Sequence, residues 1–150
     1  GGVWRMSEET AGERPIAVFE MDLPIRWGDM DAMGHVNNAV YFRYMEQLRI
    51  DWFERLGFPP NPAGEGPVIV NAHCSFMHEM RYPGTVRARQ LVGRVGRSSI
   101  ETVVEMSHSD EPERVCATGG ATIVWVDFPK RKSAPLPEWV REIVRKPVVD

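Results

Sequence analysis

The clearest pattern in the chain is an alternation of apolar and polar residues that begins at Ala17. Glu20 and Asp22 are polar and would lie on one face of a strand. The odd-numbered positions, which would lie on the other face, are apolar: Ala17, Phe19, Met21, Leu23 and Ile25. A period of two is typical of a strand with one buried face, so we predict a half-buried strand here. Pro24 marks its end or an edge position, because proline has no N–H to donate to a neighbouring strand.

The longest apolar stripe recurs at helical spacing over residues 38–56, and its members are Tyr41, Tyr44, Met45, Leu48, Trp52 and Leu56. This spacing predicts an amphipathic helix with one buried face. Asn37 or Asn38 can cap its start, since a short side-chain oxygen accepts from the unpaired N–H groups of a first turn. Gly57 ends the helix, and two prolines soon after it prevent the helix from resuming.

Four more strand candidates follow, at residues 68–77, 85–95, 98–107 and 114–127. The segments between them, RYPG, the Gly96 region and SDEPE, have good turn chemistry. Gly119 and Gly120 interrupt the last strand, which indicates either a bulge or a close approach of another backbone.

A short helix that begins at Leu136 closes the pattern, with Trp139, Ile143 and Val140 as its inward-facing candidates. The order is therefore a strand, a long helix, four strands and a short helix. An antiparallel sheet wrapped around one central helix would bury the apolar face of that helix, so we expect an α+β fold. The exposed sheet edges need covering, and side-by-side dimerisation is one way to cover them.

Length and composition narrow the class of protein. The 150 residues suit a single domain over 16–150, with the polar opening at 1–15 as a flexible tail. A net charge of -3 with scattered arginines gives no reason to expect a nucleic-acid partner. No apolar run approaches the roughly 18 residues of a membrane helix, so no membrane partner is expected either.

The cysteine content indicates the compartment. Cys74 and Cys116 lie in predicted strands without paired spacing, and no secretory signal opens the chain. Buried thiols in a reducing compartment are favoured over a disulfide, which places the expected location in the cytoplasm.

The segment RWGDMDAMGHVNN, residues 26–38, concentrates the candidate chemistry. Asp31 lies a few residues before the long helix, and Gly28 and Gly34 let the backbone turn tightly there. The start of the helix offers unpaired N–H groups and the positive end of its dipole. A carboxylate beside such a site suits acyl transfer, but the same residues also suit a simple cap and turn. Composition alone favours the cap and turn.

The sequence resembles the hotdog-fold acyl-CoA thioesterases of the 4-hydroxybenzoyl-CoA thioesterase type. The most specific match is RWGDMDAMGHVNNAVYFRYMEQLRIDWFERLG, and VIVNAHCSFMHEMRYPGTVRAR, VGRSSIETVVEM and ATGGATIVWVDFPKRKSAPLP continue it. Together they cover roughly residues 16–140. The resemblance implies a five-stranded antiparallel sheet around one long helix, with active sites at a dimer interface and no cofactor.

The resemblance also assigns roles. Asp31 matches the catalytic carboxylate, whereas Asp29 is its neighbour. The backbone N–H of Asn38 matches the group that polarises the thioester carbonyl. We therefore hypothesise thioester hydrolysis, with Asp31 either attacking the carbonyl or activating water. His35 is expected to hold the water or orient a neighbour, or else to cap and pack within the loop.

Several further residues are substrate-binding candidates, each with a structural alternative. Asn37 either bonds the local backbone, which we favour, or contacts substrate. Tyr41 and Tyr44 belong to the helix stripe, so core packing is their leading role and lining the acyl pocket the alternative. Three residues after the second strand, Met77, His78 and Met80, could border that pocket across the dimer interface.

The phosphates of coenzyme A require cationic partners, and the candidates near strand ends are Arg94, Arg97, Lys130 and Arg131. A solvated surface role is at least as good an explanation for any one of them. His73, Cys74 and His78 form a conceivable metal-ligand set. However, alternation places His73 and Cys74 on opposite faces of a strand, so packing is favoured and no metal is expected.

Competing functions remain open at this stage. A hotdog module could bind acyl-CoA without hydrolysing it, although a sensor has no need of Asp31. A hydratase on the same fold would carry a different histidine pattern from GHVNN. An acyl carrier protein could replace coenzyme A as the acyl donor. For the assembly we expect a homodimer at least, with a homotetramer favoured, and the acyl chain preference stays open.

Overall fold

The computed structural model describes residues 14–148, so nearly all of the tail predicted at 1–15 lies outside the described residues. The strands are β1 (Ile16–Pro24), β2 (Glu65–Phe76), β3 (Thr85–Val95), β4 (Ser99–His108), β5 (Val115–Asp127) and the two-residue β6 (Lys132–Ser133). The helices are the 3-10 turn η2 (Trp27–Asp29), α1 (Asn38–Leu56) and α2 (Glu138–Ile143). The predicted order of strands and helices is confirmed.

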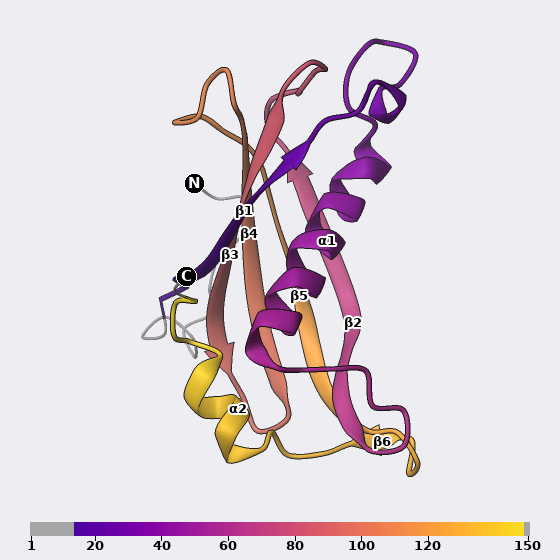
Figure 1. The fold of residues 1–150 in the computed structure, drawn as a ribbon, viewed down its shortest axis with the longest axis vertical. Helices are drawn as coiled ribbons and strands as arrows, with labels where there is room; N and C mark the ends of the chain where they lie inside the picture. Colours follow the sequence, from indigo (N-terminus) through magenta and orange to yellow (C-terminus); the bar gives the residue numbers. More distant parts are fainter. Residues whose placement is uncertain (1–13, 149–150) are drawn as a thin grey trace.

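One antiparallel sheet forms the scaffold, with the strand order β1-β3-β4-β5-β2 and with β6 paired to β5. Figure 1 shows this sheet curving along α1, which lies against one of its faces. The predicted architecture, an antiparallel sheet around one long helix, is therefore confirmed. β1 and β2 are the two edges of the described sheet, and the loop ahead of α1 lies at one end of it.

A bulge in β1 corrects the strict alternation predicted for this strand. The register against β3 shifts between Ala17 and Phe19. Val18 is consequently 1% exposed, whereas Ala17 is only half-buried. The extra residue changes which side chains point to the buried face of the strand at this point, as a bulge does. The carbonyl of Val18 also accepts a hydrogen bond from the N–H of Val148, so the bulge holds the end of the described chain.

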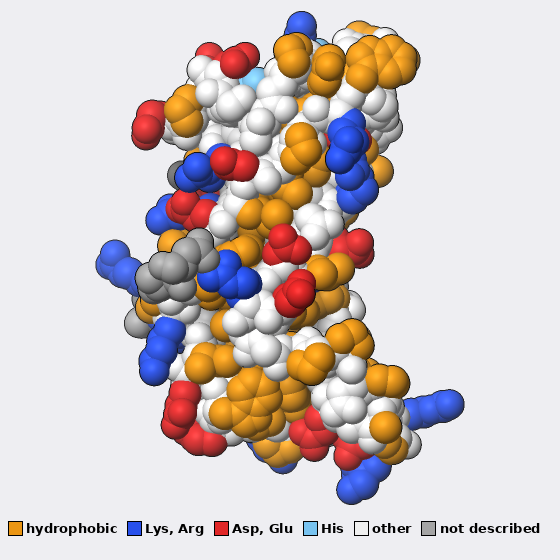
Figure 2. Space-filling view, in the orientation of Figure 1, with side chains coloured by type: hydrophobic (Ala, Val, Ile, Leu, Met, Phe, Trp, Pro, Cys, Tyr) orange, Lys and Arg blue, Asp and Glu red, His pale blue; other side chains and the backbone are white. Residues whose placement is uncertain are grey.

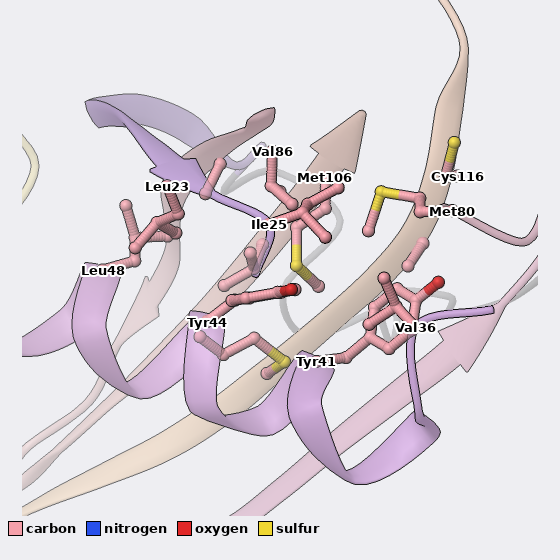
Figure 3. Packing of buried hydrophobic residues seen from close by; sticks show 14 residues of the cluster. Leu23, Ile25, Val36, Tyr41, Tyr44, Leu48, Met80, Val86, Met106 and Cys116 are labelled. Atoms are coloured by element: carbon pink, nitrogen blue, oxygen red, sulfur yellow. The ribbon is translucent and has the colours of Figure 1, made fainter. Parts of the chain in front are cut away.

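Helix α1 begins and ends where the sequence predicts. The Asn37 side chain accepts from the Ala39 N–H at 3.0 Å, which identifies Asn37 as the cap. Gly57 ends the helix in the left-handed conformation at φ +82°, where glycine has no steric cost. Figure 3 shows the buried side chains of α1 packed with residues from the sheet and from the segment after β2. Each buried side chain of this size contributes about 1.5–3 kcal/mol.

Gly119 explains how α1 can approach the sheet so closely. A Cβ at this position would lie 2.5 Å from the carbonyl oxygen of His73 and 3.0 Å from the side chain of Met45. At Gly120 a Cβ would lie 2.4 Å from the carbonyl oxygen of Thr102. Of the two predicted explanations for this glycine pair, close backbone approach is therefore correct, since the register of β5 is regular at these positions.

The terminal helix α2 packs differently from the prediction. Val140 and Val144 are fully buried, whereas Trp139 is 47% exposed and Ile143 only half-buried. The Trp139 ring lies edge-on to Phe58 at a centroid distance of 5.4 Å, so it covers the core from outside. Figure 2 shows apolar side chains gathered at this end of the molecule, over α2 and the end of α1.

Candidate active site

The segment between β1 and α1 folds into a compact loop that is tied to the rest of the protein. Met30 and Val36 form an isolated antiparallel bridge, and Gly34 makes the turn between them at φ +80°. The N–H of Val36 donates to the carbonyl of Met80 at 2.8 Å. This bond joins the loop to the segment that follows β2, so residues distant in sequence meet in front of α1.

Asp29 is the anchor of this loop. Its buried carboxylate accepts hydrogen bonds from the Arg26 N–H at 2.9 Å and from the Tyr44 hydroxyl at 2.8 Å, and it forms an ion pair with Arg43. Burial by itself raises the pKa of Asp29, but these donors and the guanidinium outweigh it and hold the pKa below its usual value. A carboxylate with both oxygens engaged in this way is suited to holding structure rather than to reacting.

Asp31 has a different environment, although it lies only two positions further along the chain. It is exposed, and its Oδ1 accepts from the N–H groups of Met33 at 2.9 Å and His35 at 3.1 Å. No hydrogen bond from residues 14–148 reaches Oδ2. One oxygen therefore fixes the orientation of the carboxylate, and the other takes no part in the hydrogen bonds of the turn that precedes α1.

His35 has contacts that the sequence pattern does not reveal. Its Nδ1 lies 3.2 Å from Glu79 Oε2, and its Nε2 lies 3.0 Å from an Arg81 guanidinium nitrogen. Arg81 also lies 3.6 Å from Glu79 Oε1, which closes a triangle of three side chains. Sequence reasoning missed Glu79 and Arg81, because only the fold brings their segment to the loop, through bonds such as those from Val36 to Met80 and from Tyr82 to Met30.

The start of α1 lies beside this turn. Asn37 donates its N–H to the Asp29 carbonyl at 2.9 Å, and its side chain caps the helix, so the favoured backbone role of Asn37 is confirmed. Asn38 is the first helical residue and is exposed. First-turn N–H groups have no acceptor within the helix, and they carry the positive end of its dipole. A carbonyl oxygen that gains negative charge would be stabilised there.

The tyrosines of α1 are core residues in this structure. Tyr41 is 2% exposed and lies edge-on to Phe76 at a centroid distance of 5.0 Å. Burial raises the pKa of Tyr41 to about 12. Burial and the contact with Asp29 also raise the pKa of Tyr44. Figure 3 shows both rings among the buried side chains, so the described chain gives Tyr41 a packing role.

The segment after β2 borders a pocket near the loop. Met77, His78 and Met80 line it together with Arg81 and other residues, and its volume is about 540 Å³. The three candidates for bordering an acyl pocket therefore do line one concavity of the described chain. Its lining combines the two methionines with imidazole and charged side chains.

The arginine and lysine candidates for phosphate binding lie elsewhere. Arg94 and Arg97 belong to the β3–β4 hairpin, and Lys130 and Arg131 lie between β5 and β6. Figure 1 shows both turns at the end of the sheet opposite to the loop ahead of α1. A single chain therefore does not bring these four side chains to Asp31.

The conceivable metal ligands do not gather. A Cβ at Gly120 would contact the His73 ring, while Cys74 packs against the core cluster beside α1, so the two lie on opposite faces of β2. Burial raises the pKa of Cys74 to about 11. Within residues 14–148, no group of three or more histidine, cysteine or acidic side chains could hold a metal ion. Both cysteines are free thiols.

Comparison with known proteins points to one family. Residues 25–144 match the model of the thioesterase-like superfamily. A solved structure of a candidate thioesterase from Pseudomonas aeruginosa is 35% identical with a TM-score of 0.79, over 84% of this chain and 97% of that one. A candidate acyl-CoA thioesterase from Xanthomonas campestris is 26% identical with a TM-score of 0.68, over 80% and 99%.

An uncharacterised Bacillus subtilis protein, YsmA, is 26% identical over 124 residues, which are 83% of this chain and 81% of that protein. None of the helices in the described part of the chain combines the length and apolarity needed to cross a bilayer.

Proposed function

Because this chain belongs to the thioesterase-like superfamily and has the hotdog fold, we propose that it hydrolyses acyl-CoA thioesters with Asp31 as its reacting group. The observation that carries this proposal is the turn at Asp31, which presents an exposed carboxylate directly ahead of the N-terminus of α1. The buried and fully engaged Asp29 is unsuited to that role.

The proposed reaction places the thioester carbonyl oxygen at the N–H groups near Asn38. As the carbonyl carbon becomes tetrahedral, negative charge on this oxygen is stabilised by donors that are already in place, an effect of about 3–4 kcal/mol for a good donor. Oδ2 of Asp31 is the reacting oxygen, since Oδ1 is held by the turn.

Two routes fit this geometry. In the first, Oδ2 attacks the carbonyl carbon, the carbon–sulfur bond breaks, and the coenzyme A thiolate leaves; water then cleaves the mixed anhydride and restores Asp31. In the second, Oδ2 takes a proton from water while the water oxygen attacks, and the departing thiolate recovers that proton. Both consume one water and release a free acid and a thiol.

The acyl donor is proposed as acyl-CoA on the support of the Xanthomonas campestris relative, which is described as a candidate acyl-CoA thioesterase. An acyl carrier protein thioester is the alternative donor. A binding module without turnover is the alternative function, and the exposed carboxylate at Asp31 argues against it.

A thiol-release assay over short, medium, long and aromatic acyl-CoAs tests the function directly. The expected result is release of free coenzyme A by the wild type and a loss of at least about 100-fold in kcat for Asp31→Asn, because the amide keeps the shape but cannot act as base or nucleophile. Asp51→Asn is the matched control, since it removes the same charge from the body of α1, where Asp51 bonds Gln47.

Thiol release by Asp31→Asn within a few-fold of wild type would remove Asp31 from the chemistry. Binding of acyl-CoA by a wild type that releases no thiol from any donor, acyl carrier protein included, would identify a binding module instead.

A homodimer is proposed on the same basis, with pairs of dimers forming a tetramer. β2 is an edge of the described sheet. Exposed apolar side chains lie along it and directly after it, among them Val70, Phe76 and Met77. A two-fold axis beside an antiparallel edge strand reverses the second copy end for end. In such a dimer, the partner subunit's Arg94 and Arg97, which lie at the far end of the partner's sheet, would come close to the end that carries Asp31.

A further inference from the structure

The contacts of His35 define which of its ring nitrogens carries the proton. We propose that Glu79 is a positioning residue that holds His35 as the neutral Nδ1–H tautomer, that Arg81 occupies Nε2 until a water replaces it there, and that Nε2 then orients this attacking water as a hydrogen-bond acceptor. This inference rests on the proposed function, because it assigns a role to His35 in that hydrolysis.

The tautomer follows from the chemistry of the two partners. A guanidinium has N–H donors and no acceptor, so the 3.0 Å contact from Arg81 requires an unprotonated Nε2. The single proton of the neutral ring is then on Nδ1, where it points at Glu79 Oε2 at 3.2 Å. The His35 side chain is 24% exposed, whereas its partners Glu79 and Arg81 are 56% and 64% exposed, so the ring is the more shielded side of both contacts.

Two other histidines of this chain have the opposite arrangement. His78 receives a hydrogen bond from Arg114 at Nδ1, so its proton is on Nε2. His108 accepts from the Asp110 N–H at Nδ1 and donates from Nε2 to the Arg81 carbonyl at 2.8 Å. His35 therefore differs from both, although all three lie around the same segment after β2.

The position of His35 connects its tautomer to Asp31. The Asp31 N–H donates to the His35 carbonyl at 2.7 Å, and the His35 N–H donates to Asp31 Oδ1 at 3.1 Å, so one tight turn carries both groups. In the proposed arrangement, a water gives one hydrogen to Oδ2 and the other to Nε2, which leaves its lone pairs free for a carbonyl carbon. An Nε2–H tautomer would instead donate to that water and turn it away.

The Arg81 guanidinium occupies the position from which a water would donate to Nε2. Its side chain is 64% exposed and also lies 3.6 Å from Glu79 Oε1, so it keeps a carboxylate partner when water replaces it at Nε2. Glu79 therefore contributes twice, by accepting from Nδ1 and by retaining the guanidinium.

Nitrogen-15 NMR of the histidine side chains tests the tautomer without reference to activity. Spectra are recorded at about pH 8, above the ordinary imidazole range near 6.5, and His35→Gln identifies the His35 signals. The expected result is a protonated Nδ1 and bare Nε2 for His35, with the reverse for His78 and His108. A His35 ring that is Nε2–H or doubly protonated overturns the proposal.

Kinetics then tests what the tautomer does. Glu79→Met removes, at similar length, both the acceptor at Nδ1 and the carboxylate that retains Arg81, so the Nε2–H form should appear. The kcat should then fall about tenfold, the value of one ordinary hydrogen bond, with KM within about twofold. Glu79→Gln keeps an amide oxygen that can accept from Nδ1, so it should retain the tautomer and most of kcat. Glu105→Met is the matched control, because Glu105 pairs with Arg89 on the outer face of the sheet.

Each outcome is decisive for one part of the proposal. A Glu79→Met protein with the wild-type tautomer removes the positioning role. A changed tautomer with an unchanged kcat removes the water-orienting role. If the wild type hydrolyses no thioester, the proposed function fails, whereas the NMR assignment of His35 still stands or falls alone.

Discussion

At the scale of single residues, two aspartates two positions apart have opposite environments. Asp29 is buried with donors on both oxygens, whereas Asp31 is exposed and uses one oxygen to hold its own turn. The sequence places both in one motif, and only the resemblance to a family separates their roles. The structure gives a physical basis for this separation, because Tyr44 and Arg43 reach from α1 to Asp29, whereas Oδ2 of Asp31 receives no hydrogen bond from residues 14–148.

The lowered pKa of Asp29 makes a prediction about stability and pH. A carboxyl whose pKa is lower in the folded than in the unfolded state stabilises the fold above its unfolded pKa of about 3.9, and this contribution is lost as the pH falls through the folded value. Asp29→Asn should therefore cost about 2 kcal/mol at neutral pH. Urea unfolding of both proteins should show the difference shrinking from about pH 5 to about pH 2.

Asp22→Asn is the control for this experiment. Asp22 pairs with Arg87 at 2.7 Å, but both side chains are more than half exposed, so its loss should cost less than about 1 kcal/mol. A free-energy difference between wild type and Asp29→Asn that stays constant with pH would contradict the assigned cause.

At the scale of elements, periodicity was sufficient for α1 and for the order of the strands, because each buries one continuous face. It failed at two places where a local feature changes the face. The bulge near Val18 changes which residues of β1 face the core, and nothing in an apolar run of sequence indicates where a bulge will occur. In α2, six residues are too few for a stripe to choose between Val140 and Trp139.

The candidate site divides in the same way. The cap at Asn37 and the turn around Asp31 are local in sequence, so the motif predicts them. Glu79 and Arg81 reach His35 only through the fold, and no spacing within the chain could indicate them.

The contact between α1 and β5 gives a prediction at this scale. Gly119→Ala would place a methyl group 2.5 Å from a backbone oxygen, so the strand pair or the helix must shift, at a cost of about 1–3 kcal/mol. Thermal unfolding followed by circular dichroism should show a lower Tm. Gly28→Ala is the control, since nothing lies within 4 Å of that added atom. Equal Tm values for the two variants would show that the β2–β5 pair and the Met45 side chain accommodate a methyl group at residue 119.

At the scale of the whole molecule, the two ends of the sheet carry different candidate groups. Asp31 and the start of α1 lie at one end, and Arg94 and Arg97 lie at the other (Figure 1). A dimer through β2 would pair each end with the opposite end of a second copy. The proposed site is then complete only between subunits, with phosphate contacts from one and the carboxylate from the other.

Arg97→Ala tests this division. The KM for acyl-CoA should rise about tenfold with kcat little changed, since a charge-assisted contact to a phosphate acts equally in the ground and transition states. An acyl-pantetheine, which lacks the nucleotide phosphates, should show no change. Arg87→Ala on the outer face is the matched control.

Subunit mixing distinguishes the two placements of Arg97. At low acyl-CoA concentration, hybrids of Arg97→Ala and Asp31→Asn chains should regain activity, because one of their two sites holds both wild-type groups. If Arg97 served the site of its own chain, every hybrid site would lack one group and mixing would restore nothing.

The hydroxyl of Tyr44 has a consequence for protein engineering. It is a residue of the core, yet it holds the Asp29 carboxylate that anchors the loop. Transplanting residues 26–38 into another scaffold would therefore transfer the sequence of the motif without the conformation of the loop. A recipient would need the phenol and the guanidinium of Arg43 at the same places on its own helix before the grafted loop could adopt its present form.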